Sequence, residues 1–219
     1  MDKVNLVTLS DPQAPATEAY RALRMNLAFT SLDKSLETLV VSSPAPDETK
    51  SPVAANLAIV MAQAEQRVIL VDVDLRRPHL HQIFGVPQEP GVTTVMLSQA
   101  DDAVALPLVD TPVPGLRLLS SGALPPNPAA ILASKKMQYL LTQLKAEADV
   151  VIFDAPPVTV AVDASVMAAQ TDGLLLVVRA GHTRRDRIEQ AKEMLAHSRV
   201  RLLGAVFTDA SGGGLLTGY

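Results

Sequence analysis

The chain has 219 residues, of which 48% are hydrophobic and 19% charged, and its formal net charge at pH 7 is −4. This composition is typical of one globular α/β domain and excludes a largely disordered chain, which would contain fewer apolar residues. The acidic charge balance argues against nucleic acid as a partner, and the absence of cysteine excludes disulfides and thiolate metal ligands.

The first expected element is a helix over residues 16–31. The residues before it contain no apolar signal core, and no apolar run in the chain approaches the ~20 residues that cross a bilayer. We therefore expect a cytoplasmic protein that reaches the inner face of a membrane only through a partner.

From residue 36 onward, short apolar runs alternate with stretches of helical length. The runs are mostly continuous in Val, Leu and Ile, which is typical of strands covered on both faces. This alternation predicts a mainly parallel sheet with helices on both faces, in one α/β domain over residues 1–210, followed by a flexible Gly-rich tail over 211–219. The expected strands are 36–43, 67–74, 116–122, 149–157, 173–181 and 201–207, and the expected helices are 52–66, 127–147, 163–170 and 184–198.

Charged and hydroxyl side chains follow three of these strands. Lys50 and Ser51 come after the first, Asp72 and Asp74 end the second, and Asp154 ends the run VVIFD. A strand, a loop, a Lys-Ser pair and a helix in this order hold phosphates on backbone amides, with Ser51 on Mg²⁺ and carboxylates from neighbouring strands beside it. Each feature alone is common in turns and on surfaces, but together they predict a nucleotide site at the carboxyl edge of the sheet.

Longer stretches of the chain resemble a known family. They are EAYRALRMNL, VILVDVDLRRPHLHQIFG, SSGALPPNPAAILASKKMQYLL, DVVIFDAPPV, VDASVMAAQTDGLLLVVRAGHT and LLGAVF, which cover the chain from about residue 17 to 208. They resemble the bacterial tyrosine kinases, or BY-kinases, which are P-loop ATPases that govern export and polymerisation of capsular and extracellular polysaccharide. The resemblance implies a three-layer P-loop NTPase fold that uses ATP, releases ADP and requires Mg²⁺.

The resemblance also assigns roles to single residues. Lys50 would face the phosphates and Ser51 would hold Mg²⁺, while Asp72 and Asp74 match an Asp pair near Mg²⁺ and the tyrosine hydroxyl, from which the family draws its base. Asp154 matches the Walker B carboxylate, which acts on Mg²⁺ directly or through water. The family's first Walker motif is Pro-Gly-Glu-Gly-Lys-Ser-Thr, and the residues here are Pro46, Asp47, Glu48, Thr49, Lys50, Ser51 and Pro52.

A third set of residues matches the family's oligomerisation motif. Glu18, Arg21 and Arg24 are spaced three apart, which places them within one sector of a helix of roughly 120°. The residues alone favour a solvated charged face. The resemblance implies instead that subunits close into a ring, or pair with an active homologue, and that a cytoplasmic segment of a transmembrane polysaccharide co-polymerase activates them.

The phosphate loop departs from the family at its glycines. Glycines in such a loop permit positive φ and close approach of the backbone to phosphate, and a non-glycine residue in a left-handed conformation costs roughly 1–2 kcal/mol. Two are replaced here, and Thr49 replaces one of them. Asp47 replaces the other, and a carboxylate ~4 Å from a phosphate oxygen costs on the order of 4 kcal/mol at an effective dielectric near 20. Pro52 removes an amide that would point toward the phosphates.

Two further departures lie near the end of the chain. Thr208 and Asp209 stand where the family has an Asn that reads the adenine edge, and Tyr219 is the single tyrosine of the tail. Tyr219 is the expected phosphorylation site, whereas Tyr20 and Tyr139 are expected to pack against the core.

These departures predict a BY-kinase-like protein with poor ATP binding and turnover, a pseudokinase-like regulator of polysaccharide synthesis. One alternative is an active autokinase that phosphorylates Tyr219. The other is an ATPase of the partition or septum-site type, which is disfavoured because the C-terminus lacks a basic amphipathic membrane helix.

Overall fold

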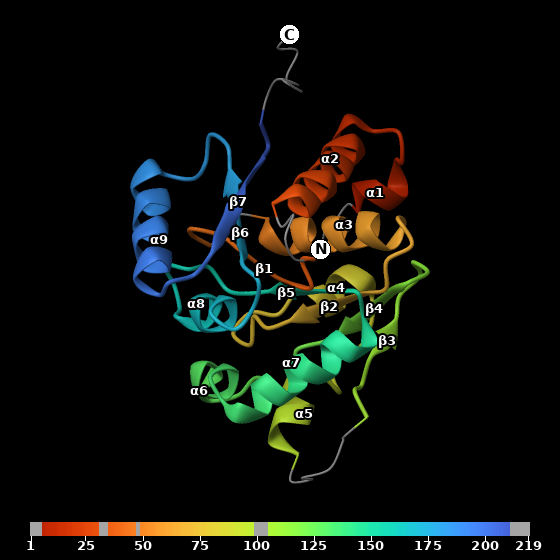
Figure 1. The fold of residues 1–219 in the computed structure, drawn as a ribbon, viewed down its shortest axis with the longest axis vertical. Helices are drawn as coiled ribbons and strands as arrows, with labels where there is room; N and C mark the ends of the chain where they lie inside the picture. Colours follow the sequence, from red (N-terminus) through yellow and green to blue (C-terminus); the bar gives the residue numbers. More distant parts are fainter. Residues whose placement is uncertain (1–5, 31–34, 47–48, 99–104, 211–219) are drawn as a thin grey trace.

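A seven-stranded sheet forms the centre of the computed structural model, which describes residues 6–30, 35–46, 49–98 and 105–210 (Figure 1). The strand order is β3-β4-β2-β5-β1-β6-β7, and every neighbouring pair is parallel except β3 with β4. The strands are β1 (Thr38–Ser42), β2 (Val68–Asp72), β3 (Val109–Asp110), β4 (Leu116–Leu119), β5 (Val150–Asp154), β6 (Leu174–Arg179) and β7 (Leu202–Thr208).

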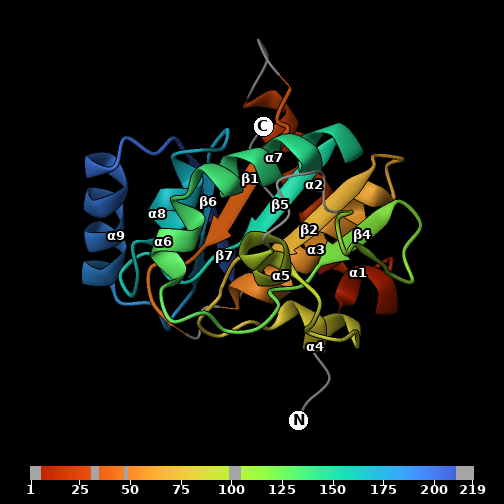
Figure 2. The same ribbon diagram turned by 90° about the horizontal axis from the view of Figure 1, so that it is seen from below.

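Helices cover both faces of this sheet (Figures 1 and 2). The first four helices lie on one face and the other five on the opposite face, each group with its own apolar core. The first group is α1 (Val7–Ser10), α2 (Pro15–Phe29), α3 (Lys50–Ala62) and α4 (Leu80–Phe84), and the second is α5 (Val92–Leu97), α6 (Pro128–Leu132), α7 (Lys135–Glu147), α8 (Asp163–Ala168) and α9 (Arg185–His197).

The alternation of side chains along the strands explains the two cores. In β5, Val151 and Phe153 pack against α5–α9, whereas Ile152 between them packs against the α2–α4 side. All five residues of β1, β2 and β5 are buried, as expected for strands covered on both faces. The predicted α/β class and the six predicted strands are therefore confirmed.

The helix predicted over residues 127–147 is wrong as a single element. Asn127 caps α6 by accepting from the Ala130 amide at 3.3 Å, and after Leu132 the chain starts a new helix at Lys135. Ser134 forms the second cap, because its Oγ accepts from the Met137 amide at 3.2 Å and donates to the Ile131 carbonyl at 2.7 Å. The hydroxyl therefore joins the end of α6 to the start of α7.

Replacing Ser134 with Ala is expected to lower the free energy of unfolding by about 1 kcal/mol, since the Met137 amide loses its capping acceptor. Denaturant unfolding of the intact chain measures the difference. Ser134→Thr keeps the hydroxyl and should remain within about 0.5 kcal/mol of the parent. Equal stability of Ser134→Ala and the parent would show that the cap contributes nothing.

No helix among the described residues combines the length and the apolar character that a membrane span requires.

Candidate active site

The predicted site residues meet at the carboxyl edge of the sheet because β2, β5 and β1 are adjacent there. Lys50, the first residue of α3, places its Nζ 3.0 Å from Asp74 Oδ2 and 3.1 Å from Asp154 Oδ1. The Ser51 hydroxyl donates to the other oxygen of Asp154. Asp72 lies opposite Asp154 in the register of β2 and β5. All five residues are buried, with Lys50 the most exposed at 8%.

The charges of this cluster act strongly on one another. Burial alone would lower the pKa of Lys50, but the negative charges of Asp154 and Asp74 outweigh it and raise that pKa above its ordinary value. Burial raises the pKa of Asp72, and the like charge of Asp154 raises it further. Burial also raises the pKa of Asp154, against the lowering effect of Lys50. Three carboxylates therefore share one cation in a site with little water.

The two carboxylates of the β2 end have different surroundings. Asp72 Oδ2 accepts from the backbone amides of His79 and Leu80, both at 3.0 Å, and its Oδ1 accepts from the Asp74 amide at 3.2 Å. Asp74 Oδ1 accepts from the Arg77 amide at 3.0 Å, while its Oδ2 faces Lys50. Asp72 thus holds the loop between β2 and α4, and Asp74 presents one oxygen to the site.

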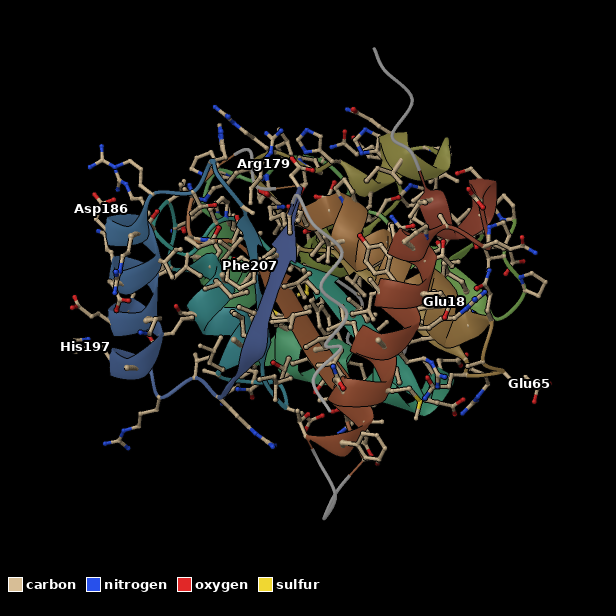
Figure 3. All side chains as sticks on the ribbon, turned by 90° about the horizontal axis from the view of Figure 1, so that it is seen from above. Glu18, Glu65, Arg179, Asp186, His197 and Phe207 are labelled. Atoms are coloured by element: carbon tan, nitrogen blue, oxygen red, sulfur yellow. The ribbon has the colours of Figure 1, made fainter. Side chains whose placement is uncertain are left out.

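Thr49 ends the phosphate loop in a left-handed conformation, with φ 58° and ψ 25°. Its hydroxyl lies 3.1 Å from that of Thr208, which ends the edge strand β7. Asp209 pairs instead with Arg179, whose Nε lies 2.6 Å from Asp209 Oδ2. Arg179 is the last residue of β6 (Figure 3). Pro52 is the third residue of α3, and Asp47 and Glu48 lie outside the described residues. Thr49 thus has a left-handed backbone conformation, which costs a threonine roughly 1–2 kcal/mol.

A cleft of about 490 Å³ opens at this cluster, a volume within the usual range of small-molecule sites. Lys50 and Thr49 lie at its phosphate end. Neither Asp72 nor Thr208 lines it. Its lining residues come from the end of β1, the start of α3, the segment between β2 and α4, and the segment after β5: Ser43, Pro46, Thr49, Lys50, Ser51, Pro52, Asp74, Arg76, Arg77, His79, Gln82, Ile83, Pro156, Pro157 and Val160.

The donor set suits Mg²⁺. Ser51 offers a hydroxyl beside Asp154, and Asp72 and Asp154 are neighbouring carboxyl groups whose pKa values are raised by burial. Among the described residues, no group of three or more His, Cys, Asp or Glu side chains forms a self-sufficient metal site. Mg²⁺ does not require one, because it is usually held by one or two carboxylates together with water and substrate phosphates.

Arg76 was not singled out from the sequence, although it lies in the LRRP stretch. Its Nε lies 2.9 Å from Asp163 Oδ2 and its Nη2 3.2 Å from Asp163 Oδ1, and Asp163 is fully buried at the start of α8. The pair ties the segment after β2 to the other helical layer. The two residues are 87 positions apart, so a single sequence carries no signal for this contact.

The remaining predicted residues lie away from the cleft. Glu18 lies on the outer surface of α2 (Figure 3). It forms an ion pair with Arg21, and Arg24 follows on the same helix. Tyr20 packs against the core, where burial raises its pKa to about 12. The expectation that Tyr139 packs is wrong, because it is 52% exposed on α7. Tyr219 lies outside the described residues.

Known proteins resemble the chain over most of its length. A family model described as ParA, the NUBPL iron-transfer P-loop NTPases, matches residues 37–208. Tyrosine-protein kinase YwqD of Bacillus subtilis is 38% identical over 202 residues, covering 92% of this chain and 84% of its own. The putative tyrosine-protein kinase EpsB of Ralstonia solanacearum is 34% identical over 196 residues, or 90% of this chain, which spans only 26% of EpsB.

Solved structures agree. The kinase domain of Escherichia coli tyrosine kinase ETK has a TM-score of 0.86 and 30% identity, covering 95% of this chain and 82% of that one. The chimerical protein CapA2B2 has a TM-score of 0.85 and 32% identity, covering 92% and 88%. The cell division ATPase MinD of Pyrococcus furiosus has a TM-score of 0.63 but 20% identity, which shows the shared fold alone. Sequence, fold and relatives thus lead to one conclusion: the chain belongs to the bacterial tyrosine kinases, the BY-kinase family of P-loop ATPases.

Proposed function

We propose that this chain is a BY-kinase of capsular or extracellular polysaccharide biosynthesis whose ATP binding and turnover are impaired, so that it acts as a pseudokinase-like regulator. The observation that carries the proposal is the backbone of Thr49, which keeps the left-handed turn of the family's glycine while adding a side chain where phosphate must approach. Pro52, without an amide hydrogen, lies in the first turn of α3. Phosphoryl transfer depends on positioning and charge, so a crowded loop harms it directly.

The retained residues define the step that the site would perform. The bond between the γ-phosphorus and the ADP oxygen breaks, a bond from that phosphorus to the tyrosine oxygen forms, and the hydroxyl proton passes to a carboxylate. Asp74 suits the role of base because it lines the cleft, which Asp72 does not; both carboxylates accept hydrogen bonds from backbone amides. Mg²⁺, held by Ser51, Asp154 and Asp72, would neutralise charge on the phosphates.

Lys50 has a second role before nucleotide arrives. Its ammonium group bridges Asp74 and Asp154, so it must leave at least one of them to reach a phosphate. A bound triphosphate would replace the lost carboxylate with its own negative charge. Lys50 therefore stabilises the empty site and exchanges partners on binding, which further weakens the apparent affinity for ATP.

Partner and location follow from the family. The proposal includes subunits that associate through Glu18, Arg21 and Arg24 into a ring or with an active homologue. It also places the protein in the cytoplasm beneath a transmembrane polysaccharide co-polymerase. The exposed Glu18–Arg21 pair on α2 supports such a contact, since it lies clear of the cleft.

A second candidate is an active autokinase that phosphorylates Tyr219. The observation that favours it is the intact cluster of Lys50, Ser51, Asp74 and Asp154, assembled at contact distances.

Calorimetric titration with Mg-ATP separates the two candidates. The proposal predicts a dissociation constant in the millimolar range, near −4 kcal/mol, because each defect of the loop removes or crowds a phosphate contact. The same titration in EDTA is the control for Mg²⁺-dependent binding. Micromolar affinity, together with phosphate on Tyr219 by mass spectrometry, would overturn the impaired-kinase proposal and establish the autokinase.

A further inference from the structure

Two segments that line the cleft, here called its walls, differ in character. One is the segment between β2 and α4 together with α4 itself, which contributes Arg77, His79, Gln82 and Ile83. The other is the segment after β5, with Pro157 and Val160, and Val160 is 56% exposed. The first wall is mainly polar and cationic, and the second is apolar.

Among the described residues that line the cleft, Lys50, Arg76 and Arg77 are cations and Asp74 is the one carboxylate; Asp47 and Glu48 of the same loop lie outside the described residues. Lys50 pairs with Asp74 and with Asp154 below it, and Arg76 pairs with the buried Asp163. Arg77 is exposed, and its guanidinium makes no ion pair with any carboxylate in the part of the chain that the structure describes. It is therefore the cation available to a ligand.

The segment around Arg77 is held in place by its own backbone. The Arg77 amide donates to Asp74 Oδ1 at 3.0 Å, and the Arg77 carbonyl lies 2.7 Å from His79 Nδ1. These contacts fix the position from which the guanidinium extends. A guanidinium can donate two parallel hydrogen bonds to one carboxylate, so a pre-positioned arginine recognises Asp and Glu in particular.

We propose that Arg77 selects acidic, tyrosine-bearing segments of another protein as ligands of this cleft. The tyrosine ring packs on Pro157 and Val160, and an Asp or Glu near that tyrosine pairs with Arg77. The inference rests on the proposed function, because the same cleft holds the nucleotide at its other end. Residues 211–219 of this chain contain no Asp or Glu, so its own tail lacks the group that Arg77 recognises.

The test is peptide binding, which requires neither ATP nor turnover. Fluorescently labelled peptides with tyrosine flanked by two Glu on each side are compared, by anisotropy against the full chain, with matched peptides carrying Gln. The acidic peptide is expected to bind at least about fivefold more tightly, as one partly exposed ion pair allows. Arg77→Gln should remove this preference while leaving the affinity for the Gln peptide unchanged.

Two controls separate recognition from general attraction. Arg199→Gln removes the same charge from an exposed residue before β7, at the opposite edge of the sheet, and should keep the preference. An acidic peptide with Ala in place of tyrosine should bind more weakly, since it loses the apolar wall.

The outcomes distinguish this inference from the proposed function. Equal binding of Glu and Gln peptides, equal loss in Arg77→Gln and Arg199→Gln, or no effect of the tyrosine would each overturn the inference. None of these results bears on the affinity for Mg-ATP. Conversely, tight Mg-ATP binding would overturn the impaired-kinase proposal and leave the peptide preference standing.

Discussion

Replacing Lys50 with Met is expected to remove the residual Mg-ATP-dependent phosphorylation of the impaired site and to lower the free energy of unfolding by about 3 kcal/mol. The side chain of Lys50 is 10% exposed and lies within 3.1 Å of two buried carboxylates. Methionine fills a similar volume but leaves Asp74 and Asp154 without their cation, and removing one partner from a buried charge cluster typically costs about 3–5 kcal/mol.

The raised pKa of Lys50 determines the pH range over which its contribution to the free energy of unfolding is present. Burial opposes the shift, and the charges of Asp154 and Asp74 outweigh it. A raised pKa means that the stabilising contribution of the cation is fully present below its ordinary value of 10.5 and is lost only as the pH rises through the higher folded value. Unfolding in guanidinium chloride at pH 7 therefore measures the whole effect.

A matched control is Lys145→Met. Lys145 pairs with Glu37 on the surface, with side-chain exposures of 40% and 37%, and an exposed pair of this kind contributes less than about 1 kcal/mol. Equal destabilisation by the two substitutions would contradict the role given to Lys50. In cells, unchanged polysaccharide output in the Lys50→Met variant would favour the pseudokinase-like regulator. Such a regulator requires the folded protein but not phosphoryl transfer.

Most of the fold could be predicted because continuous apolar runs, typical of buried strands, alternate along the sequence with stretches of helical length. Runs such as VVIFD are buried on both faces, so they read as continuous apolar strands. Short elements were missed. The strand β3 has two residues and α4 has five, and hydrophobic periodicity cannot be recognised over so few positions. The break between α6 and α7 depends on the single cap at Ser134, which interrupts an otherwise uniform helical stretch.

The site was predictable only in part, for a geometric reason. The rule that parallel strands end at one edge placed Lys50, Asp74 and Asp154 near one another without any knowledge of strand order. It could not tell Asp72 from Asp74, because the difference lies in how the chain turns after β2 and which amides it offers. The contact of Thr49 with Thr208 joins residues 159 positions apart, and local sequence patterns do not predict contacts over such separations.

That contact changes the meaning of the loop's departures from the family. Thr49 and Thr208 stand at positions where the resemblance to the family leads us to expect residues that act toward ATP, and their hydroxyls lie 3.1 Å apart. The phosphate loop is thereby joined to the end of β7. Two substitutions that look independent in the sequence are thus in contact in the structure.

Restoring both glycines, with Asp47→Gly and Thr49→Gly together, is expected to tighten Mg-ATP binding by about ten-thousandfold, the product of roughly a thousandfold at position 47 and roughly tenfold at position 49. Asp47 lies outside the described residues, and its share is argued from charge alone: a carboxylate ~4 Å from a phosphate oxygen costs on the order of 4 kcal/mol at an effective dielectric near 20. At position 49, glycine keeps φ 58° without strain and removes the Cβ from the path of the phosphate.

Single substitutions separate the gain in Mg-ATP affinity that comes from removing a charge from the gain that comes from removing side-chain atoms. Asp47→Asn removes the charge and keeps the side chain, so it should recover most of the gain at that position. Thr49→Ala keeps a Cβ and loses the hydroxyl, so it should bind Mg-ATP no better than the parent, whereas Thr49→Gly should bind roughly tenfold more tightly. Calorimetry on the five proteins gives every comparison. If the doubly restored chain binds Mg-ATP no better than the parent, the loop is not what limits this kinase, and the exchange of Lys50 between its carboxylates becomes the step to examine.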